Sequence, residues 1–321
     1  MRLAAAGILL GLATATLSAA NPQTQQAQPA QQARPTFKAG VDRVQVTAVV
    51  RKKNGQPVTD LSKDDFELLD DGQPRQILEF RSEPTPATLA LTVDYSGSMS
   101  LSSKLSAARA VAEQLLAWLT PGVDRVGLYA FDKQLQELQP LVPAPGDVLH
   151  LLETAKPYGS TSLYDAIAES GNRLASEAGT RRAVVALTDG GENSSRLTAS
   201  EVTNIASSID VPVYIVVVVS PYDRMGVTEA EDKIAYDALA TGPLGNLAHW
   251  TGGEIFLASS PAHTSLAARQ IVTELRHQYF IGFEPDNSRP GWHPISVRTR
   301  QKDLIVRARS GYVARRPESH S

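Results

Sequence analysis

Apolar runs and amphipathic stretches alternate along the middle of the chain, from residue 88 to residue 257. The apolar runs are typical of buried strands and cover residues 88–93, 125–131, 183–187, 211–219 and 254–257. Between them, apolar residues recur at helical spacing and predict helices over residues 105–119, 146–155, 163–177, 198–208 and 245–251. Strands that alternate with helices form a mostly parallel sheet with helices on both faces. We therefore predict an α/β fold with a doubly wound, Rossmann-like central sheet.

Short β-patterned segments lie on both sides of this α/β region. Before it, Val44, Val46 and Ala48 alternate with polar residues, and Asp70-Asp71-Gly72 is a turn signal. After it, residues 279–283, 295–297 and 304–308 read as three more strands. The first piece, of about 40 residues, is too short to be stable alone. We predict that both ends build one small antiparallel β domain, with an independent N-terminal sandwich as the alternative.

The predicted organisation has six parts. They are a signal peptide (1–20), a Gln/Pro-rich disordered linker (21–38), the first part of the β domain (39–84), the α/β domain (85–277), the strands that complete the β domain (278–316) and a tail (317–321).

The first 20 residues have the features of a secretory signal. Arg2 precedes an apolar run, and Ser18-Ala19-Ala20 fits the small-residue cleavage rule, so we place the cut after Ala20. A retained single-span anchor is the alternative. We expect an exported protein, periplasmic or secreted, with no stable membrane span after cleavage.

Charge and composition exclude several classes of function. Lys plus Arg number 31 and Asp plus Glu 34, a net charge of −3 that argues against a nucleic-acid binder. The absence of cysteine excludes disulfides, thiolate metal sites, thiol nucleophiles and a lipid anchor on cysteine. The six histidines show no grouping that would make a metal site from sequence neighbours. The basic residues near the C-terminus are predicted to form a solvated strand edge: Arg307, Arg309, Arg315 and Arg316.

Oxygen-bearing side chains follow the predicted strands at the sheet edge where ligands of α/β folds bind. Asp94-Tyr95-Ser96-Gly97-Ser98 follows the first strand, Gly159-Ser160-Thr161-Ser162 precedes a helix, and Thr188-Asp189-Gly190 ends another strand. Together they offer two carboxylates and several hydroxyls, without nitrogen or sulfur. Such a donor set suits a hard cation, above all Mg²⁺.

The five residues Asp94, Ser96, Ser98, Thr161 and Asp189 resemble the metal-ion-dependent adhesion site of von Willebrand factor type A domains. The whole chain also resembles secreted von Willebrand factor A-related proteins of Acidobacteria, in its N-terminal piece and in the closing Gly311-Tyr312-Val313. The resemblance implies Mg²⁺, with Mn²⁺ or Ca²⁺ as alternatives. It further implies that the three hydroxyls contact the ion directly and the two carboxylates through water. An acidic side chain of a partner would then complete the octahedron of an electrophilic ion.

The predicted function is an exported, non-enzymatic protein-binding or adhesion module without catalytic residues. Its expected partner is a protein that offers an Asp or Glu carboxylate, in the cell envelope or outside the cell. The long connection 220–243 is a candidate for partner specificity.

Three other interpretations stay open at this point. Asp94 and Asp189 could cap the helices that follow them. The metal could only stabilise a structural envelope module. Ser96 could be a hydrolase nucleophile, although no G-x-S-x-G motif surrounds it.

Overall fold

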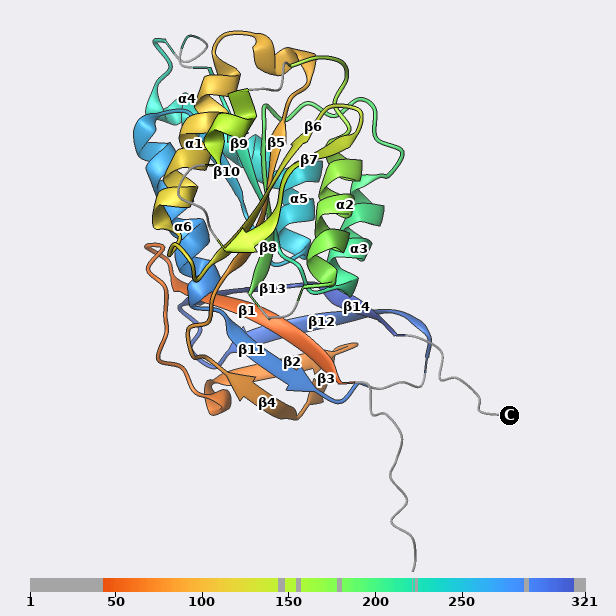
Figure 1. The fold of residues 1–321 in the computed structure, drawn as a ribbon. Helices are drawn as coiled ribbons and strands as arrows, with labels where there is room; N and C mark the ends of the chain where they lie inside the picture. Colours follow the sequence, from red (N-terminus) through yellow and green to blue (C-terminus); the bar gives the residue numbers. More distant parts are fainter. Residues whose placement is uncertain are drawn as a thin grey trace, which may run out of the picture. The chain divides into compact units, whose positions relative to one another are not determined.

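The computed structural model describes residues 43–143, 148–153, 157–177, 181–220, 222, 225–285 and 289–314 (Figure 1). The predicted signal peptide, linker and C-terminal tail lie outside these residues. None of the helices in the described ranges combines the length and the apolarity that crossing a bilayer requires.

The central sheet has six strands in the order β10-β9-β8-β5-β6-β7. Five of them run parallel, and β7 pairs antiparallel with β6 at one edge. The predicted α/β class is therefore confirmed. The strands are β5 (Thr88–Asp94), β6 (Arg125–Phe131), β7 (Leu135–Pro143), β8 (Arg182–Thr188), β9 (Val213–Val218) and β10 (Ile255–Ala258).

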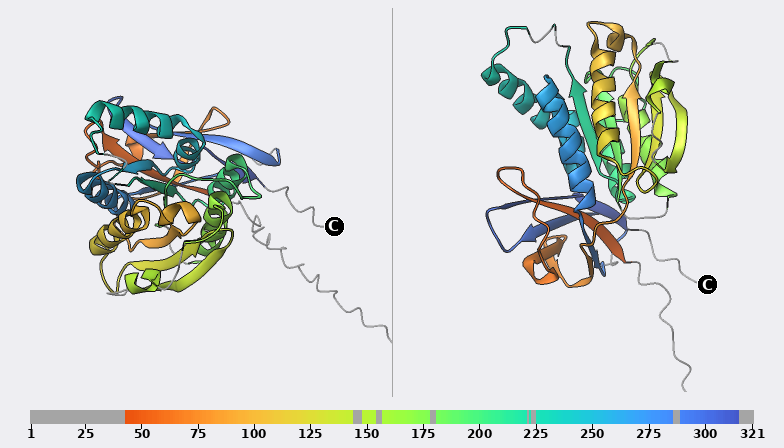
Figure 2. Two further views of the ribbon diagram at one scale, coloured as in Figure 1. Left: turned by 90° about the horizontal axis from the view of Figure 1, so that it is seen from above. Right: turned by 60° about the vertical axis from the view of Figure 1, so that its left-hand side comes forward.

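Helices cover both faces of this sheet (Figure 2). Successive residues of β5 point to opposite faces, so Leu89, Leu91 and Val93 join one hydrophobic core and Ala90 joins the other. The first core includes residues of α1 (Lys104–Trp118) and α6 (Pro261–Arg276). The second includes residues of α2 (Leu163–Ala175), α3 (Ala199–Ser208) and α5 (Pro243–Trp250).

Two four-stranded antiparallel sheets are built from the two ends of the described chain. Their strand orders are β13-β1-β11-β4 and β14-β12-β2-β3, so the N-terminal β1 and β2 pair with C-terminal strands. This confirms the predicted β structure from both ends, and an independent N-terminal sandwich is wrong. The strands are β1 (Val44–Lys52), β2 (Phe66–Asp70), β3 (Gln73–Arg75), β4 (Ile77–Arg81), β11 (Tyr279–Phe283), β12 (Gly291–Thr299), β13 (Leu304–Ala308) and β14 (Gly311–Ala314).

The structure adds elements that the hydrophobic pattern does not predict. These are β7, α6 and the helix α4 (Glu229–Thr241), which occupies half of the connection expected over residues 220–243. The predicted helix 146–155 is described only as a short 3₁₀ helix, η3 (Leu149–Glu153). Two further 3₁₀ helices are η1 (Lys63–Asp65) and η2 (Gly97–Ser100).

The expectation of a solvated basic strand edge near the C-terminus is wrong for its two described members. Arg307 and Arg309 are only 6% and 5% exposed. Arg307 pairs with Glu254 and Glu274, and Arg309 pairs with Asp210. Internal ion pairs, not solvent, therefore compensate both guanidinium charges.

Candidate metal centre

The candidate site lies where the strand order of the central sheet reverses. β5 pairs with β6 on one side and with β8 on the other, so the chain leaves β5 and β8 at neighbouring positions of one sheet edge. Asp94 is the last residue of β5, and Asp189 directly follows β8. Such a switch point is where open α/β sheets bind ligands. The topology thus brings both carboxylates to the same sheet edge.

The first loop carries Asp94, Ser96 and Ser98. Asp94 is fully buried, and its carboxylate accepts hydrogen bonds from the Ser96 backbone N–H at 2.8 Å and the Thr188 hydroxyl at 2.7 Å. The hydroxyls of Ser96 and Ser98 lie 3.1 Å apart. Asp94 therefore fixes the start of this loop and leaves the two serine hydroxyls side by side.

Backbone hydrogen bonds tie the second loop to the first. The Gly97 N–H donates to the Gly159 carbonyl at 3.0 Å, and the Tyr158 N–H donates to the Tyr95 carbonyl at 2.9 Å. An ideal Cβ on Gly97 would lie 3.3 Å from the Gly159 oxygen, so glycine allows this close approach. These contacts hold the segment before Thr161 against the serine loop.

The third loop is attached to Thr161. The Thr161 N–H donates to the Asn193 side-chain oxygen at 3.0 Å, and the N–H groups of Asn193 and Ser194 donate to the Thr161 carbonyl at 3.1 and 3.0 Å. Thr161 is itself 2% exposed. All three loops are therefore hydrogen-bonded to one another at the switch point.

Asp189 faces the second loop across a small space beside Gly191. An ideal Cβ on Gly191 would lie 3.2 Å from an Asp189 carboxylate oxygen and 3.6 Å from the Thr161 hydroxyl. Any larger residue at position 191 would therefore extend toward these oxygens. The other Asp189 oxygen lies 2.8 Å from the Lys104 ammonium, which comes from the first turn of α1.

The two carboxylates experience opposite electrostatic environments. Burial raises the pKa of Asp94, and the nearby Asp189 charge adds to this effect against the hydrogen bonds from Ser96 and Thr188. Burial also acts to raise the pKa of Asp189. The Lys104 ammonium and hydrogen bonds from Ser98 and Gly191 outweigh it, so the pKa of Asp189 is lowered. Lys104 is thus the positive charge that this oxygen cluster pairs with in the structure.

The donor set fits a hard divalent cation. The three loops place the side chains of the five predicted ligands at one edge of the sheet, and every one of those side chains offers oxygen. The ion pair with Lys104 shows that the cluster accommodates a positive charge. Gly191 has no side chain that would extend toward the Thr161 and Asp189 oxygens. Metal binding by these five residues stays a prediction, with which the geometry agrees.

Sequence reasoning missed Lys104, and it named Thr188 among the oxygen-bearing residues of the site without giving it a role. Thr188, next to Asp189, holds the Asp94 carboxylate from the neighbouring strand. Lys104 starts α1, where the helix dipole disfavours a positive charge. This unfavourable position is the signal that could have marked Lys104 as a residue with another role.

Fold and donor set together define a class of protein: an α/β domain with a candidate cation site at its topological switch point. Residues 89–192 match the family model of the von Willebrand factor type A domain. The resemblance found in the sequence is confirmed for this segment, which contains all five candidate ligands. A search of curated protein sequences finds no significant match.

Solved structures similar to the chain come from several bacteria. BatB, a conserved hypothetical protein from Bacteroides thetaiotaomicron, has 18% identity over 58% of this chain and 97% of its own, with a TM-score of 0.44. A von Willebrand factor type A protein from Catenulispora acidiphila has 12% identity over 78% of this chain and 73% of its own, with a TM-score of 0.46. An aerotolerance-related membrane protein from Bacteroides fragilis has 20% identity over 58% and 97%, with a TM-score of 0.43.

Proposed function

We propose that this protein is an exported, non-enzymatic module that binds an acidic group of a partner protein through Mg²⁺. The ion would bind at the candidate site described above, which we call the strand-end site: Asp94, Ser96, Ser98, Thr161 and Asp189. One observation carries the proposal. Three loops of a von Willebrand factor type A segment meet at the switch point, with oxygen donors on each and an ammonium group already paired with Asp189. The family resemblance supports protein interaction or adhesion as the general role.

The residues would divide the binding of the ion between them. Ser96, Ser98 and Thr161 would provide hydroxyl ligands, and the carboxylates of Asp94 and Asp189 would act through water. When bound, Mg²⁺ supplies an electrophilic position for a carboxylate oxygen of the partner. Asp94 orients the serine loop through the Ser96 N–H, and Thr188 holds Asp94 in turn.

The hydrogen bonding of the site supports binding rather than hydrolysis. In the described residues, the Ser96 hydroxyl bonds the Ser98 hydroxyl, while Asp94 bonds the Ser96 backbone and Thr188. A serine hydrolase would instead place a histidine between the serine and the acid. We therefore assign Ser96 to metal binding.

The segment 220–243 is our candidate for partner specificity. It begins beyond the end of β9, the neighbour of β8, so it starts from the same sheet edge as the site. Tyr222, Met225 and Ile234 are 67%, 79% and 68% exposed. Exposed apolar side chains of this kind are typical of a binding surface.

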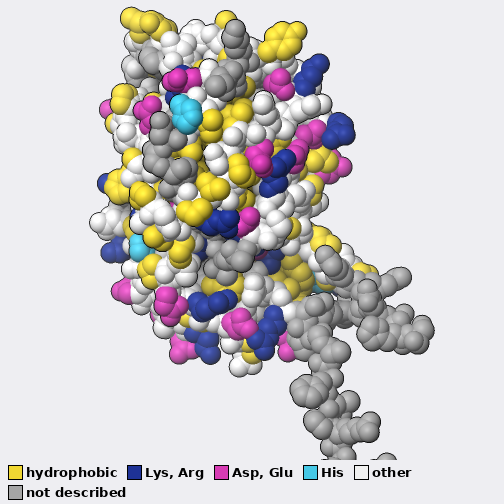
Figure 3. All heavy atoms as spheres, in the orientation of Figure 1, with side chains coloured by type: hydrophobic (Ala, Val, Ile, Leu, Met, Phe, Trp, Pro, Cys, Tyr) yellow, Lys and Arg dark blue, Asp and Glu magenta, His cyan; other side chains and the backbone are white. Residues whose placement is uncertain are grey.

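Export and the nature of the partner rest on the sequence. Residues 1–20 predict a signal peptide, so the partner would be in the cell envelope or outside the cell. Basic and acidic side chains lie interspersed on the face shown in Figure 3. That mixture and the net charge of −3 favour a protein partner over a nucleic acid.

The test measures metal and partner together, using the chain from residue 21 onward. Calorimetry with Mg²⁺ should show submillimolar binding that Asp94→Ala abolishes. Envelope proteins retained in Mg²⁺ should be lost in EDTA and with Asp94→Ala. Asp303→Ala, in an exposed turn between β12 and β13, is the control and should retain both.

Two results would contradict the proposal. Absence of submillimolar binding of any divalent ion would exclude the metal site. Metal binding that raises the melting temperature without any chelation-sensitive partner would favour the structural envelope module instead.

A further inference from the structure

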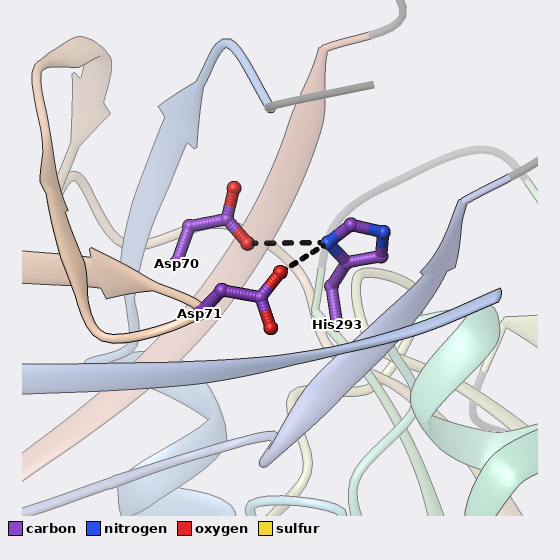
Figure 4. Close-up of side chains that lie close together, drawn as sticks. All are labelled: Asp70, Asp71 and His293. Atoms are coloured by element: carbon purple, nitrogen blue, oxygen red, sulfur yellow. Dashed lines mark ion pairs between the residues drawn. The ribbon is translucent and has the colours of Figure 1, made fainter. Parts of the chain in front are cut away.

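A second group of metal-ligating side chains lies in the antiparallel sheets (Figure 4). Asp70, Asp71 and His293 place one potential ligand atom each within 4.8 Å of one another. The His293 Nδ1 atom is 2.8 Å from an Asp71 oxygen and 3.9 Å from an Asp70 oxygen. These residues share no member with the strand-end site.

Local structure explains why these residues meet. Asp70 ends β2, and β12 pairs with β2 so that Ile295, two residues after His293, lies opposite Asp70. Asp71 and Gly72 form the turn to β3 with positive φ angles of 51° and 75°. Asp-Gly is favoured in such a turn. The Asp71 N–H also donates to the Pro294 carbonyl at 3.0 Å, which holds the turn against β12.

The hydrogen bonding of His293 shows that its buried Nδ1 atom has no regular hydrogen-bond donor. Its Nε2 atom is 2.8 Å from the Arg289 backbone carbonyl, which can only accept, so Nε2 carries a proton. In a neutral imidazole, Nδ1 is then an acceptor that faces two carboxylates. Nδ1 is buried and makes no hydrogen bond of regular geometry within the described chain. In that tautomer the His293 Nδ1 and the Asp71 oxygen are two acceptors 2.8 Å apart, and two acceptors this close require a cation or an additional proton between them.

Two of the three side chains, Asp70 and His293, are also held in place by neighbouring groups. The Tyr312 hydroxyl donates to Asp70 at 3.2 Å. Arg75 lies 3.4 Å from the other Asp70 oxygen. The Arg289 carbonyl fixes the imidazole. Outer partners of this kind orient the ligands in metal sites.

We propose that Asp70, Asp71 and His293 bind one divalent transition-metal ion of the Zn²⁺ type. One imidazole and two carboxylates are ligands that Zn²⁺ accepts, whereas Mg²⁺ prefers oxygen alone. Arg289 pairs with Asp71 at 2.8 Å, but its side chain is 71% exposed and is free to turn into solvent when an ion binds. The Asp71 side chain is 25% exposed, so water can reach the ion as a fourth ligand.

The experiment uses the chain from residue 21 onward in millimolar Mg²⁺, which fills the strand-end site if that site binds Mg²⁺. Zn²⁺ is then titrated against a chromogenic chelator. We expect one equivalent of Zn²⁺, and Asp71→Asn should weaken its binding at least tenfold. Asparagine suits the positive φ of this turn, so the variant should fold even where His293→Ala does not.

The matched control is Asp303→Asn, the same change in another exposed turn of these sheets, which should keep full Zn²⁺ affinity. X-ray absorption of the Zn²⁺-loaded chain should show nitrogen and oxygen ligands at about 2.0–2.2 Å. Equal Zn²⁺ affinity of the unchanged chain and Asp71→Asn, or no Zn²⁺ binding at all, would overturn the proposal.

Discussion

Two clusters of this protein both pair carboxylates with basic side chains, but they differ in how firmly the positive charges are held. The strand-end site combines Asp94 and Asp189 with Lys104. A second cluster, which we call the buried ion network, consists of Arg51, Glu254, Gln270, Glu274 and Arg307. It joins β1 and β13 of the antiparallel sheets to α6 and to Glu254, the residue before β10, of the α/β region.

The buried ion network is closed by its own members. Arg51 makes two hydrogen bonds of 2.7 Å to Glu254, and Arg307 pairs with Glu254 at 2.9 Å and with Glu274. Gln270 donates to both glutamates, at 2.8 and 3.0 Å. Two positive charges therefore balance two negative charges, and the acceptors are bonded within the protein. Such a network fixes how elements pack.

The strand-end site keeps one exchangeable charge. Its hydroxyls bond one another, and Asp189 is paired with a single lysine whose side chain is 21% exposed. A flexible ammonium can leave and be replaced by another cation, whereas a guanidinium held on several sides cannot. The comparison teaches that the number of internal partners of the charged residues, more than their identity, distinguishes a candidate binding site from a structural cluster.

The largest effect is expected from breaking the buried ion network. Arg307→Met should lower the free energy of unfolding by about 3–5 kcal/mol, because Glu274, 4% exposed, loses its buried partner. Chemical denaturation measures this loss. Arg298→Met, an exposed arginine on β12, should change stability by less than about 0.5 kcal/mol. Mg²⁺ affinity should remain unchanged in both variants. A loss of Mg²⁺ affinity with Arg307→Met alone would show that the two clusters are energetically coupled.

The next effect concerns the residue behind the strand-end site. Thr188→Val removes the hydroxyl that holds Asp94 and should weaken Mg²⁺ binding by about 10–100-fold in calorimetry. Thr92→Val is the matched control, because Thr92 lies on β5, next to β8, and the change removes its buried hydrogen bond to Ser170 of α2. If both variants lose stability but neither loses Mg²⁺ affinity, Asp94 has only a structural role.

Much of the fold was predictable because its signals are local. All seven residues of β5 are buried, and the six before Asp94 stand in the sequence as a mostly apolar run that leads directly into it. The switch-point rule then places Asp94 and Asp189 at one sheet edge from the order of elements alone. The positions of the candidate ligands were thus predictable.

The missed parts depend on contacts between distant residues. α4 contains no buried residue, so it lacks an apolar stripe, although Thr228 and Glu231 form a capping box that marks its start. Arg307 and its partner Glu274 are 33 residues apart, and no local pattern shows that the pair is buried. Likewise, His293 meets Asp70 only through the pairing of β2 and β12.

Low pH tests Asp124, a carboxylate that is fully paired within the protein, as the glutamates of the buried ion network are. Asp124 accepts from the Thr120 and Ala87 N–H groups at 2.7 and 2.8 Å and pairs with Arg276 at 2.8 Å. Burial acts to raise the pKa of Asp124, but these partners outweigh it and lower the pKa. Its stabilisation is therefore complete above the unfolded pKa of about 3.9 and is lost as the pH falls through the lower folded value.

Asp124→Asn should lower the free energy of unfolding at neutral pH by about 1.5 kcal/mol. Denaturation at a series of pH values should show the difference from the unchanged chain shrinking in acid. A difference that stays constant down to the lowest pH at which the chain folds would contradict the assigned pKa direction.

The smallest expected effect is an increase in Mg²⁺ affinity. Lys104→Gln removes the positive charge that occupies Asp189 and should strengthen Mg²⁺ binding about threefold to tenfold, or ~0.7–1.4 kcal/mol. Lys233→Gln is the control, because it breaks a lysine–aspartate pair of 2.7 Å on the exposed surface of α4 and should leave the affinity unchanged. Calorimetry in low salt, where electrostatic competition is least screened, is the suitable measurement. Weaker Mg²⁺ binding by Lys104→Gln would show that the lysine supports the site instead of competing with the ion, and the distinction between an exchangeable and a closed cluster would fail.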